Sequence, residues 1–458
     1  MRALLAAAAL ACAVAPAFAR DAAVQAAPQA PSTFAFVDVD VLPMDRDVRL
    51  PAQTVVVRDG RIVAMGAADG TPVPDGATRI DGAGHVLMPG LAEMHGHVPG
   101  SDDPAYVEDT LALYLANGVT LVRNMSGDVS HPALRARIAS GEVDGPTLVV
   151  ASPWLRSEDA DAVAQDVRDH HAAGFDLIKL GSIPADTYPR MVATAQSLGI
   201  PFAGHIPEGV PLETALDAKQ ASIDHLDRYV EFLVPPGTDM GDREAGWFGS
   251  GWVHRVDRGR LDEAVARTRD AGTWNVPTLT LVEHMASPEP AETMLQWPEM
   301  RYMPTSVRER WRRAKQEYAA RETFQPDAAA ALVDLRRDLL KALHDGGAPI
   351  VLGSDAPQFF NVPGYSIHRE MAMMQAAGLS PYEVLVTGTR NAAEALGTPE
   401  AFGTVAVGRR ADLVLLAGDP REDLAHAAEP VGVMAGGRWW PRAELDARLE
   451  AIAARHAD

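Results

Sequence analysis

The sequence predicts an α/β protein in which a (β/α)8 TIM barrel is combined with a composite β-sandwich. Residues 91–397 alternate short apolar runs with amphipathic segments of helical period, as in a parallel sheet covered by helices. Residues 34–90 and 398–458 instead carry β-type runs broken by turns such as Asp59-Gly60. Because these two segments flank the same middle, we expect the two ends of the chain to meet and form the β-sandwich together.

Eight barrel strands are expected in the middle segment. They are predicted near residues 91–94, 120–123, 147–151, 176–180, 201–204, 221–224, 275–281 and 349–353. Two intervals, 230–272 and 285–345, are too long for simple connections between strand and helix. We expect both to leave the barrel on the side where a substrate binds, the first of them as a loop or lid.

The first residues of the chain indicate export. Residues 1–19 combine a basic start, a short apolar run and an Ala-x-Ala ending, which predict a signal peptide cleaved after Ala19 and a periplasmic or secreted protein. A lipoprotein attached through Cys12 is the alternative. The apolar run is shorter than the roughly 20 residues of a membrane span, so no span is expected. Residues 20–33 are predicted to be a flexible leader.

Composition narrows the partners and the chemistry. The net charge of −21 repels phosphate backbones and argues against nucleic acid or anionic membranes as partners. A small-molecule substrate and a possible homo-oligomer remain. Cys12 is the only cysteine, so the mature chain would contain no thiol. Zinc, if bound, must therefore be held by histidine and carboxylate side chains.

Two histidines at the end of the first barrel strand form half of a metal site. Alternate residues of a strand point the same way, so His95 and His97 converge while Gly96 leaves room between them. Four further residues that suit a metal site end short apolar runs of their own, and they are Lys179, His205, His225 and Asp355. Because the carboxyl ends of parallel barrel strands meet at one face, we expect all six residues to form one site.

Lys179 changes the expected number of metals. The chain has 37 arginines but only 4 lysines, and Lys179 alone lies in an apolar strand. Burial and neighbouring metal ions favour the neutral amine, which reacts with carbon dioxide to give a carbamate that can bridge two metals. The alternative is a lysine whose ammonium reaches the barrel rim and pairs with an acid.

Asp355 is the expected catalytic residue. A carboxylate beside a metal can take a proton from attacking water and return it to the leaving amine. Its alternative role is that of a helix cap after Gly353-Ser354. Arg123, Tyr229 and His284 lie at or beyond strand ends and are candidate substrate-binding residues.

Two other functions compete with a two-metal hydrolase. His205 and Glu208 have the His-x-x-Glu spacing of a mononuclear zinc site, in which the glutamate would move protons in a cyclic amidine or lactam hydrolase or in a deaminase. A non-catalytic exported binding protein with the same fold is the third possibility. The number of metal ions bound per chain distinguishes the two-metal hydrolase from the mononuclear enzyme. Hydrolysis assays test whether the chain is a non-catalytic binding protein.

The motifs together resemble the amidohydrolase superfamily, and within it the imidazolonepropionase-like and prolidase-like branch. The resemblance rests on the motifs 87–97, Leu-Ile-Lys179, Gly204-His205, Ile-Asp-His225, Gly-Ser-Asp355, 389–397 and 403–414. It implies a barrel with a composite β-sandwich and a binuclear zinc site bridged by a carboxylated lysine.

Carried over residue by residue, the resemblance assigns every member of the cluster. It implies that His95, His97 and Asp355 bind the first zinc ion, that His205 and His225 bind the second, and that carboxylated Lys179 contacts both. The implied activity is hydrolysis of the amide bond of dipeptides, including Xaa-Pro, or of N-acyl amino acids. A zinc-activated hydroxide would attack the amide carbon, with Asp355 as proton shuttle.

Overall fold

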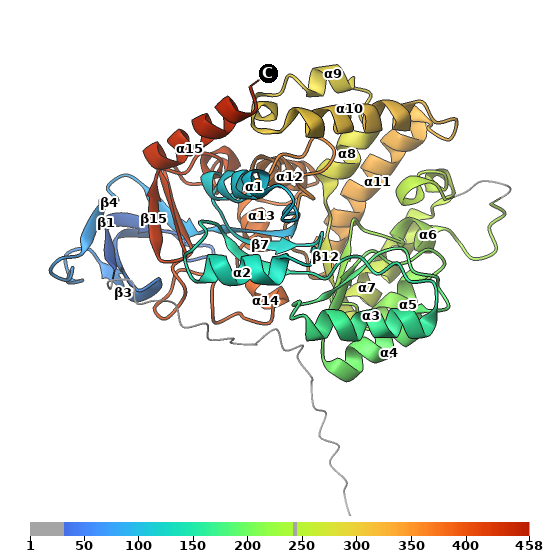
Figure 1. The fold of residues 1–458 in the computed structure, drawn as a ribbon, viewed down its shortest axis with the longest axis horizontal. Coiled ribbons are helices and arrows are strands. Elements are labelled where there is room, and N and C mark those ends of the chain that lie inside the picture. The colour runs from blue at the N-terminus through green and yellow to red at the C-terminus, as the bar shows by residue number, and fades with distance from the viewer. Residues whose placement is uncertain (1–31, 241–244, 458) are drawn as a thin grey trace, which may run out of the picture.

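The computed structural model describes residues 32–240 and 245–457. The predicted signal peptide, 1–19, and most of the predicted leader, 20–33, lie outside the described residues. A β-sheet region occupies one end of the molecule, and a larger body of strands and helices occupies the rest (Figure 1).

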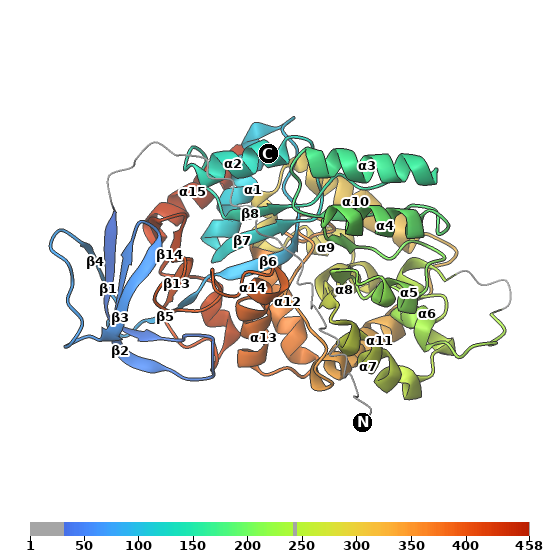
Figure 2. The ribbon, with the colours of Figure 1, turned by 90° about the horizontal axis from the view of Figure 1, so that it is seen from below.

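Strands from both ends of the chain share one eight-stranded sheet. Its strands are β1 (Thr33–Val41), β2 (Leu50–Arg58), β3 (Arg61–Ala67), β4 (Thr78–Asp81), β5 (Val86–Pro89), β13 (Leu413–Leu416), β14 (Gly432–Ala435) and β15 (Arg438–Pro441). The order is β15-β14-β13-β5-β1-β2-β3, with β4 paired to β1. Among the described residues these strands are joined by hydrogen bonds into one sheet, and the expected sandwich stays a prediction. Figure 2 shows β5, β13 and β14 between the outer strands and the body.

Local sequence explains this sheet. The hairpin between β2 and β3 turns at Asp59 and Gly60, which have φ of 50° and 70°, as the Asp-Gly pair predicts. Inward-facing apolar side chains such as Phe36, Leu87 and Met434 are buried together on the sheet. The N- and C-terminal segments meet where β5 pairs antiparallel with β13.

Seven of the eight expected barrel strands form two parallel sheets. One contains β6 (Leu91–Gly96), β7 (Val119–Asn124) and β8 (Thr147–Val150), and the other contains β9 (Ile178–Leu180), β10 (Phe202–Gly204), β11 (Ser222–Asp224) and β12 (Trp274–Val276). A single parallel bridge, Ala151 to Leu177, joins the two sheets. Residues 349–356 stand where the eighth strand is expected, and they contact both sheets through single bridges, Asn275 to Ile350 and Gly96 to Ala356.

The predicted strand 275–281 is wrong in its second half. The strand stops at Val276, and Leu279–Ala286 form the helix α8. Pro277 has no N–H to continue the ladder, and Thr278 turns the chain with a left-handed φ of 46°. The carboxylate of Glu370 then accepts hydrogen bonds from the N–H groups of Leu279 and Thr280, both at 2.8 Å, and so caps the new helix.

Helices surround the parallel strands. The first eight are α1 (Pro104–Ala116), α2 (His131–Ala139), α3 (Ala160–Ala172), α4 (Tyr188–Leu198), α5 (Leu212–Asp217), α6 (Tyr229–Leu233), α7 (Leu261–Ala271) and α8. The remaining seven are α9 (Ala291–Met294), α10 (Thr305–Ala319), α11 (Pro326–Asp345), α12 (Tyr365–Ala376), α13 (Pro381–Thr387), α14 (Arg390–Ala395) and α15 (Arg442–Arg455). Short 3₁₀ helices occur at Trp247–Gly249, Val253–Arg255, Arg258–Arg260, Pro298–Tyr302 and Leu424–Ala427.

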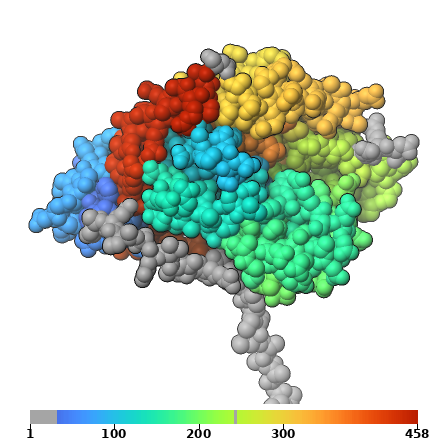
Figure 3. All heavy atoms as spheres, viewed as in Figure 1, coloured from blue at the N-terminus to red at the C-terminus, as the bar shows by residue number. Residues whose placement is uncertain are grey.

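Much of the two long intervals is helical. The interval 230–272 contains most of α6, three 3₁₀ helices and α7, and the interval 285–345 is built largely from α9, α10 and α11. The C-terminal helix α15 contacts α1 and the 3₁₀ helix Pro298–Tyr302, and it lies along the surface between the β-sheet region and the second interval (Figure 3). None of the described helices is long and apolar enough to cross a membrane.

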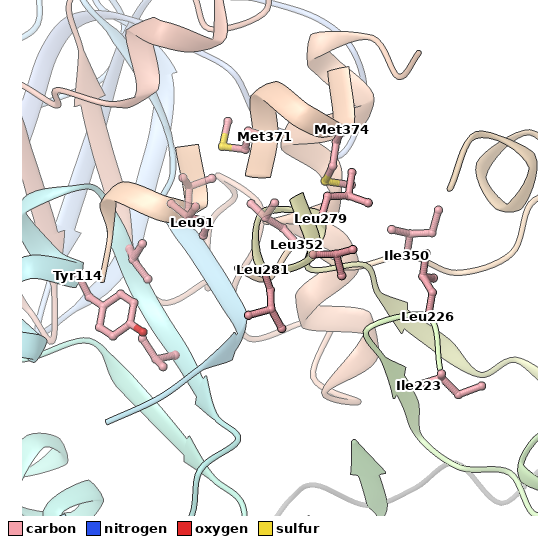
Figure 4. Close-up of a cluster of buried hydrophobic side chains, with 14 of the residues drawn as sticks. Leu91, Tyr114, Ile223, Leu226, Leu279, Leu281, Ile350, Leu352, Met371 and Met374 are labelled. Atoms are coloured by element: carbon pink, nitrogen blue, oxygen red, sulfur yellow. The ribbon is translucent and has the colours of Figure 1, made fainter. Parts of the chain in front are cut away.

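An apolar core fixes the strands relative to the helices. Figure 4 shows four residues of this core, namely Leu91 of β6, Leu279 of α8, Met371 of α12, and Leu352 of the segment 349–356. Each of them is at most 2% exposed. Burial of large aliphatic side chains contributes roughly 1.5–3 kcal/mol each to folding. This packing sets the positions of the strand ends, where the polar cluster described next lies.

Candidate metal centre

The structure brings His95, His97 and Asp355 together. His95 is in β6, His97 follows it, and Asp355 lies in the neighbouring segment 349–356, whose backbone hydrogen bonds to β6. Asp355 Oδ1 is 3.0 Å from His97 Nε2 and 3.5 Å from His95 Nε2. The ligand atoms of these three residues all lie within 4.8 Å of one another, close enough to hold one metal ion.

The remaining three residues join the same cluster. The ring centroid of His225 lies 4.6 Å from that of His95 and 4.7 Å from that of His205. Lys179 Nζ lies 3.7 Å from the carboxylate of Asp224, which in turn contacts His95. All six predicted site residues are therefore brought together at the ends of the parallel strands.

Three of the histidines have a side-chain oxygen close to Nδ1. Asp224 Oδ2 lies 2.8 Å from His95 Nδ1, and Asp227 Oδ2 lies 2.8 Å from His205 Nδ1. Thr278 Oγ1 lies 2.8 Å from His225 Nδ1, and the Thr278 hydroxyl itself donates to the Pro277 carbonyl. An accepting oxygen close to Nδ1 favours the proton on that nitrogen, which leaves the lone pair of Nε2 for a metal. Histidines that bind metals are usually oriented in this way by a partner at the other ring nitrogen.

Burial keeps three of the cluster's imidazoles, those of His95, His97 and His225, neutral. Burial lowers the pKa of His95 to about 3, and it lowers the pKa values of His97 and His225 well below the ordinary range. Burial alone would raise the pKa of Asp224, but His95, Arg123 and Lys179 beside it lower that pKa overall. Neutral imidazoles next to a carboxylate are the ligands that zinc prefers in the absence of thiolates.

Lys179 lies in a site that glycine keeps open. Its side chain is fully buried, and burial lowers its pKa despite the nearby carboxylate of Asp224. Gly204 of β10 faces it with φ of 112°, and a Cβ there would lie 2.8 Å from Lys179 Cδ and 3.0 Å from Nζ. The ring of Trp154 lies 5.6 Å from Nζ. The amine is thus held in a confined space that a side chain at position 204 would occupy.

The donor set fits metal binding. His97 Nε2, Lys179 Nζ and Asp355 Oδ1 are buried and make no hydrogen bond within residues 32–240 and 245–457. Buried polar atoms are seldom left unpaired, because their desolvation is costly. The ligand atoms point toward one another rather than toward protein partners, as the atoms around a bound cation do.

Several residues that support the cluster are not evident from strand-end reasoning. They are Glu93, Asp224, Asp227 and Thr278. Glu93 lies two residues before His95, so it points to the same side of the strand as His95 and His97. This alternation is the sequence signal that could have identified it. It accepts hydrogen bonds from the backbone N–H groups of His95 and Ser354. Burial raises the pKa of Glu93 to about 8.

The three candidate substrate-binding residues have different surroundings. Arg123 is buried beside the cluster and donates to the Met94 carbonyl and to Asp224. These donors therefore bind protein acceptors rather than point toward a substrate. Tyr229 is fully buried, and its hydroxyl bonds to Thr268 and Asn275 rather than facing the cluster.

His284 and Glu208 stand apart from the ligand contacts described above. His284 lies in α8, only 4% exposed, with its ring 4.9 Å from that of Trp297. Glu208 is exposed in a turn. Within the described ranges neither forms a hydrogen bond or an ion pair with the six clustered residues, and the role of Glu208 as a proton carrier stays a prediction.

Comparisons with known proteins agree with this geometry. The model of the amidohydrolase family matches residues 86–440. A putative prolidase from Bifidobacterium longum has a similar structure, with a TM-score of 0.68 and 22% identity over 92% of this chain and 99% of that chain. A bottromycin amidohydrolase is similar with a TM-score of 0.67 and 25% identity over 92% of this chain and 90% of that chain. These similarities indicate a TIM-barrel-like α/β fold.

A curated relative matches over a shorter stretch. The enamidase of Eubacterium barkeri is 45% identical over 94 residues, which are 20% of this chain and 24% of that protein. The chain thus spans about a quarter of that relative in the alignment.

Proposed function

This chain belongs to the amidohydrolase family, and from that premise we propose that it is a hydrolase of carbon–nitrogen bonds that cleaves the amide bond of dipeptides or N-acyl amino acids at a two-zinc centre. The observation that carries the proposal is the convergence of four histidines, Asp355 and a fully buried lysine on one cluster. Similarity in fold to a putative prolidase supports the choice of substrate class.

Each residue of the cluster has a role in the proposal. His95, His97 and Asp355 would hold one zinc ion, His205 and His225 the other, and Lys179 would contact both as a carbamate. The carbamate forms when the neutral amine bonds to the carbon of carbon dioxide and releases one proton. Bound zinc would polarise the amide carbonyl and acidify water.

Asp355 moves the proton in this proposal. Its Oδ1 makes no hydrogen bond within the described part of the chain, so it can take a proton from water attacking the amide carbon and return it to the leaving nitrogen.

The side chains of His97 and His205 are 14% and 24% exposed, whereas that of His95 is 1% exposed. The substrate would therefore approach over His97 and His205.

The proposal extends to location and architecture. Residues 1–19 have the composition of a signal peptide, which favours export to the periplasm or the medium. The bridges from segment 349–356 to both parallel sheets favour a single (β/α)8 barrel. The single eight-stranded sheet would then be the counterpart of the composite β-sandwich.

Metal counting and a hydrolysis screen test the function. We expect zinc-loaded protein to contain two ions per chain and to release free amino acid from some Xaa-Pro dipeptides or N-acyl amino acids. Asp355→Asn keeps the shape of the side chain, and we expect it to lower kcat by about 10²–10⁴-fold, the usual contribution of general acid–base catalysis. One ion per chain with deaminase or lactamase activity, or unchanged turnover in D355N, would contradict the proposal.

A further inference from the structure

Both long intervals reach the second pair of histidines from outside the strands. Arg336 of α11 comes from the interval 285–345, and Phe248 comes from the interval 230–272. We infer that Arg336 is a positioning residue for His225 and thereby for the second metal ion. The inference rests on the proposed two-zinc centre.

Arg336 is a buried cation whose two terminal nitrogens donate to backbone carbonyls. It is 3% exposed. Its Nη1 donates to the carbonyl oxygen of His225 at 2.6 Å, and its Nη2 donates to that of Pro277 at 2.7 Å. In the described ranges, no carboxylate forms an ion pair with it. A guanidinium presents its donors in a rigid planar fork, so the two contacts fix the distance between the two carbonyls.

These carbonyls belong to the two turns that orient the His225 ring. His225 has φ of 60° and Thr278 has φ of 46°, both in the left-handed region. Residues other than glycine hold such conformations only when the surrounding structure imposes them. Thr278 is also the partner of His225 Nδ1. Arg336 therefore constrains both the backbone of the ligand and the backbone of the residue that orients its imidazole.

Phe248 completes the support from the other interval. Its ring centroid lies 5.5 Å from that of His225, and the guanidinium carbon of Arg336 lies 5.6 Å from the same ring. Phe248 thus packs against both the ligand and the arginine that holds it. The two intervals are expected on the substrate side, and in addition they hold His225 in place through Arg336 and Phe248.

The first half of the centre has no such contact with Arg336. His95, His97 and Asp355 are held by β6 and by segment 349–356 through backbone hydrogen bonds and Glu93. Loss of the arginine fork should therefore weaken one metal position and spare the other. A general loss of stability would weaken both positions together.

Titration of metal-free protein with Zn²⁺ against a competing chromophoric chelator gives one dissociation constant for each ion. We expect Arg336→Met to weaken the second ion by about 10–100-fold, the usual effect of losing a group that orients a ligand, and to leave the first within about twofold. His205→Asn provides the reference for a damaged second position. Arg337→Met is the matched control, because Arg337 follows on the same helix and pairs with Glu283 at 2.7 Å, and we expect it to change neither constant.

Arg336→Lys keeps the charge but not the fork, so we expect an intermediate loss. It decides the question if R336M does not fold, which circular dichroism of the metal-free protein would show. Wild-type constants for both ions in R336K and R336M, or equal weakening of both ions, would overturn the inference while wild-type protein still binds two ions. A wild-type protein that binds only one ion would overturn the proposed function and this inference with it.

Discussion

Asp224 Oδ2 lies 2.8 Å from His95 Nδ1, and both side chains are buried. The same carboxylate accepts from Arg123 through Oδ1 and lies 3.7 Å from Lys179 Nζ. One buried aspartate therefore orients a ligand of the first metal and stands beside the residue proposed to bridge both. Its negative charge offsets the positive charge of the neighbouring Arg123 guanidinium.

Asp224→Asn should impair both metal binding and folding. An amide in place of the carboxylate weakens the acceptor at His95 Nδ1, so we expect zinc affinity to fall about 10–100-fold. The buried Arg123 loses its anionic partner, so we expect the free energy of unfolding to fall by about 3 kcal/mol. Zinc titration and urea unfolding measure the two effects.

Asp217→Asn is the control for this substitution. Asp217 is an exposed carboxylate on α5, and we expect its loss to change neither zinc affinity nor stability. Wild-type zinc affinity in D224N would show that His95 is oriented by its strand alone.

Gly204→Ala should displace Lys179. Glycine holds φ of 112° there, and an added Cβ would lie 2.8–3.0 Å from the last three atoms of the lysine side chain. We expect a loss of unfolding free energy of about 1–3 kcal/mol from the strained backbone, together with loss of the second zinc ion. Urea unfolding and zinc content measure the outcome.

Gly199→Ala separates strain from the clash. Gly199 ends α4 with φ of 67°, and nothing lies within 4 Å of its Cβ position. We expect about 1 kcal/mol of destabilisation with full zinc content and activity. Equal zinc content in G204A and G199A would argue that Lys179 tolerates the added methyl group.

The sequence predicts which residues cluster at the strand ends better than it predicts the elements that hold them. The alternation of residues along a strand places His95 and His97 on one side, and short apolar runs mark the positions of His205 and His225. The helix α8 is not predictable in this way, because the carboxylate that caps it, Glu370, lies 91 positions from Leu279. Arg336 is likewise 111 positions from His225. Contacts between distant segments leave no periodic signal, so the supporting residues emerge only from the structure.

Lys179→Ala gives the sharpest test of the bridge. Without an amine no carbamate forms, so we expect the variant to lose at least one zinc ion and nearly all activity. Added acetate or formate should restore part of both, because a small carboxylate fits where the buried side chain is removed and supplies the missing anion. Wild-type protein grown or equilibrated with ¹³C-bicarbonate should show a carbamate carbon signal in NMR spectra, and K179A should not. Lys219→Ala is the control, because Lys219 is exposed and its amine donates to the Ala271 carbonyl. A fully active K179A, or wild-type protein with two zinc ions and no carbamate signal, would exclude the bridging role.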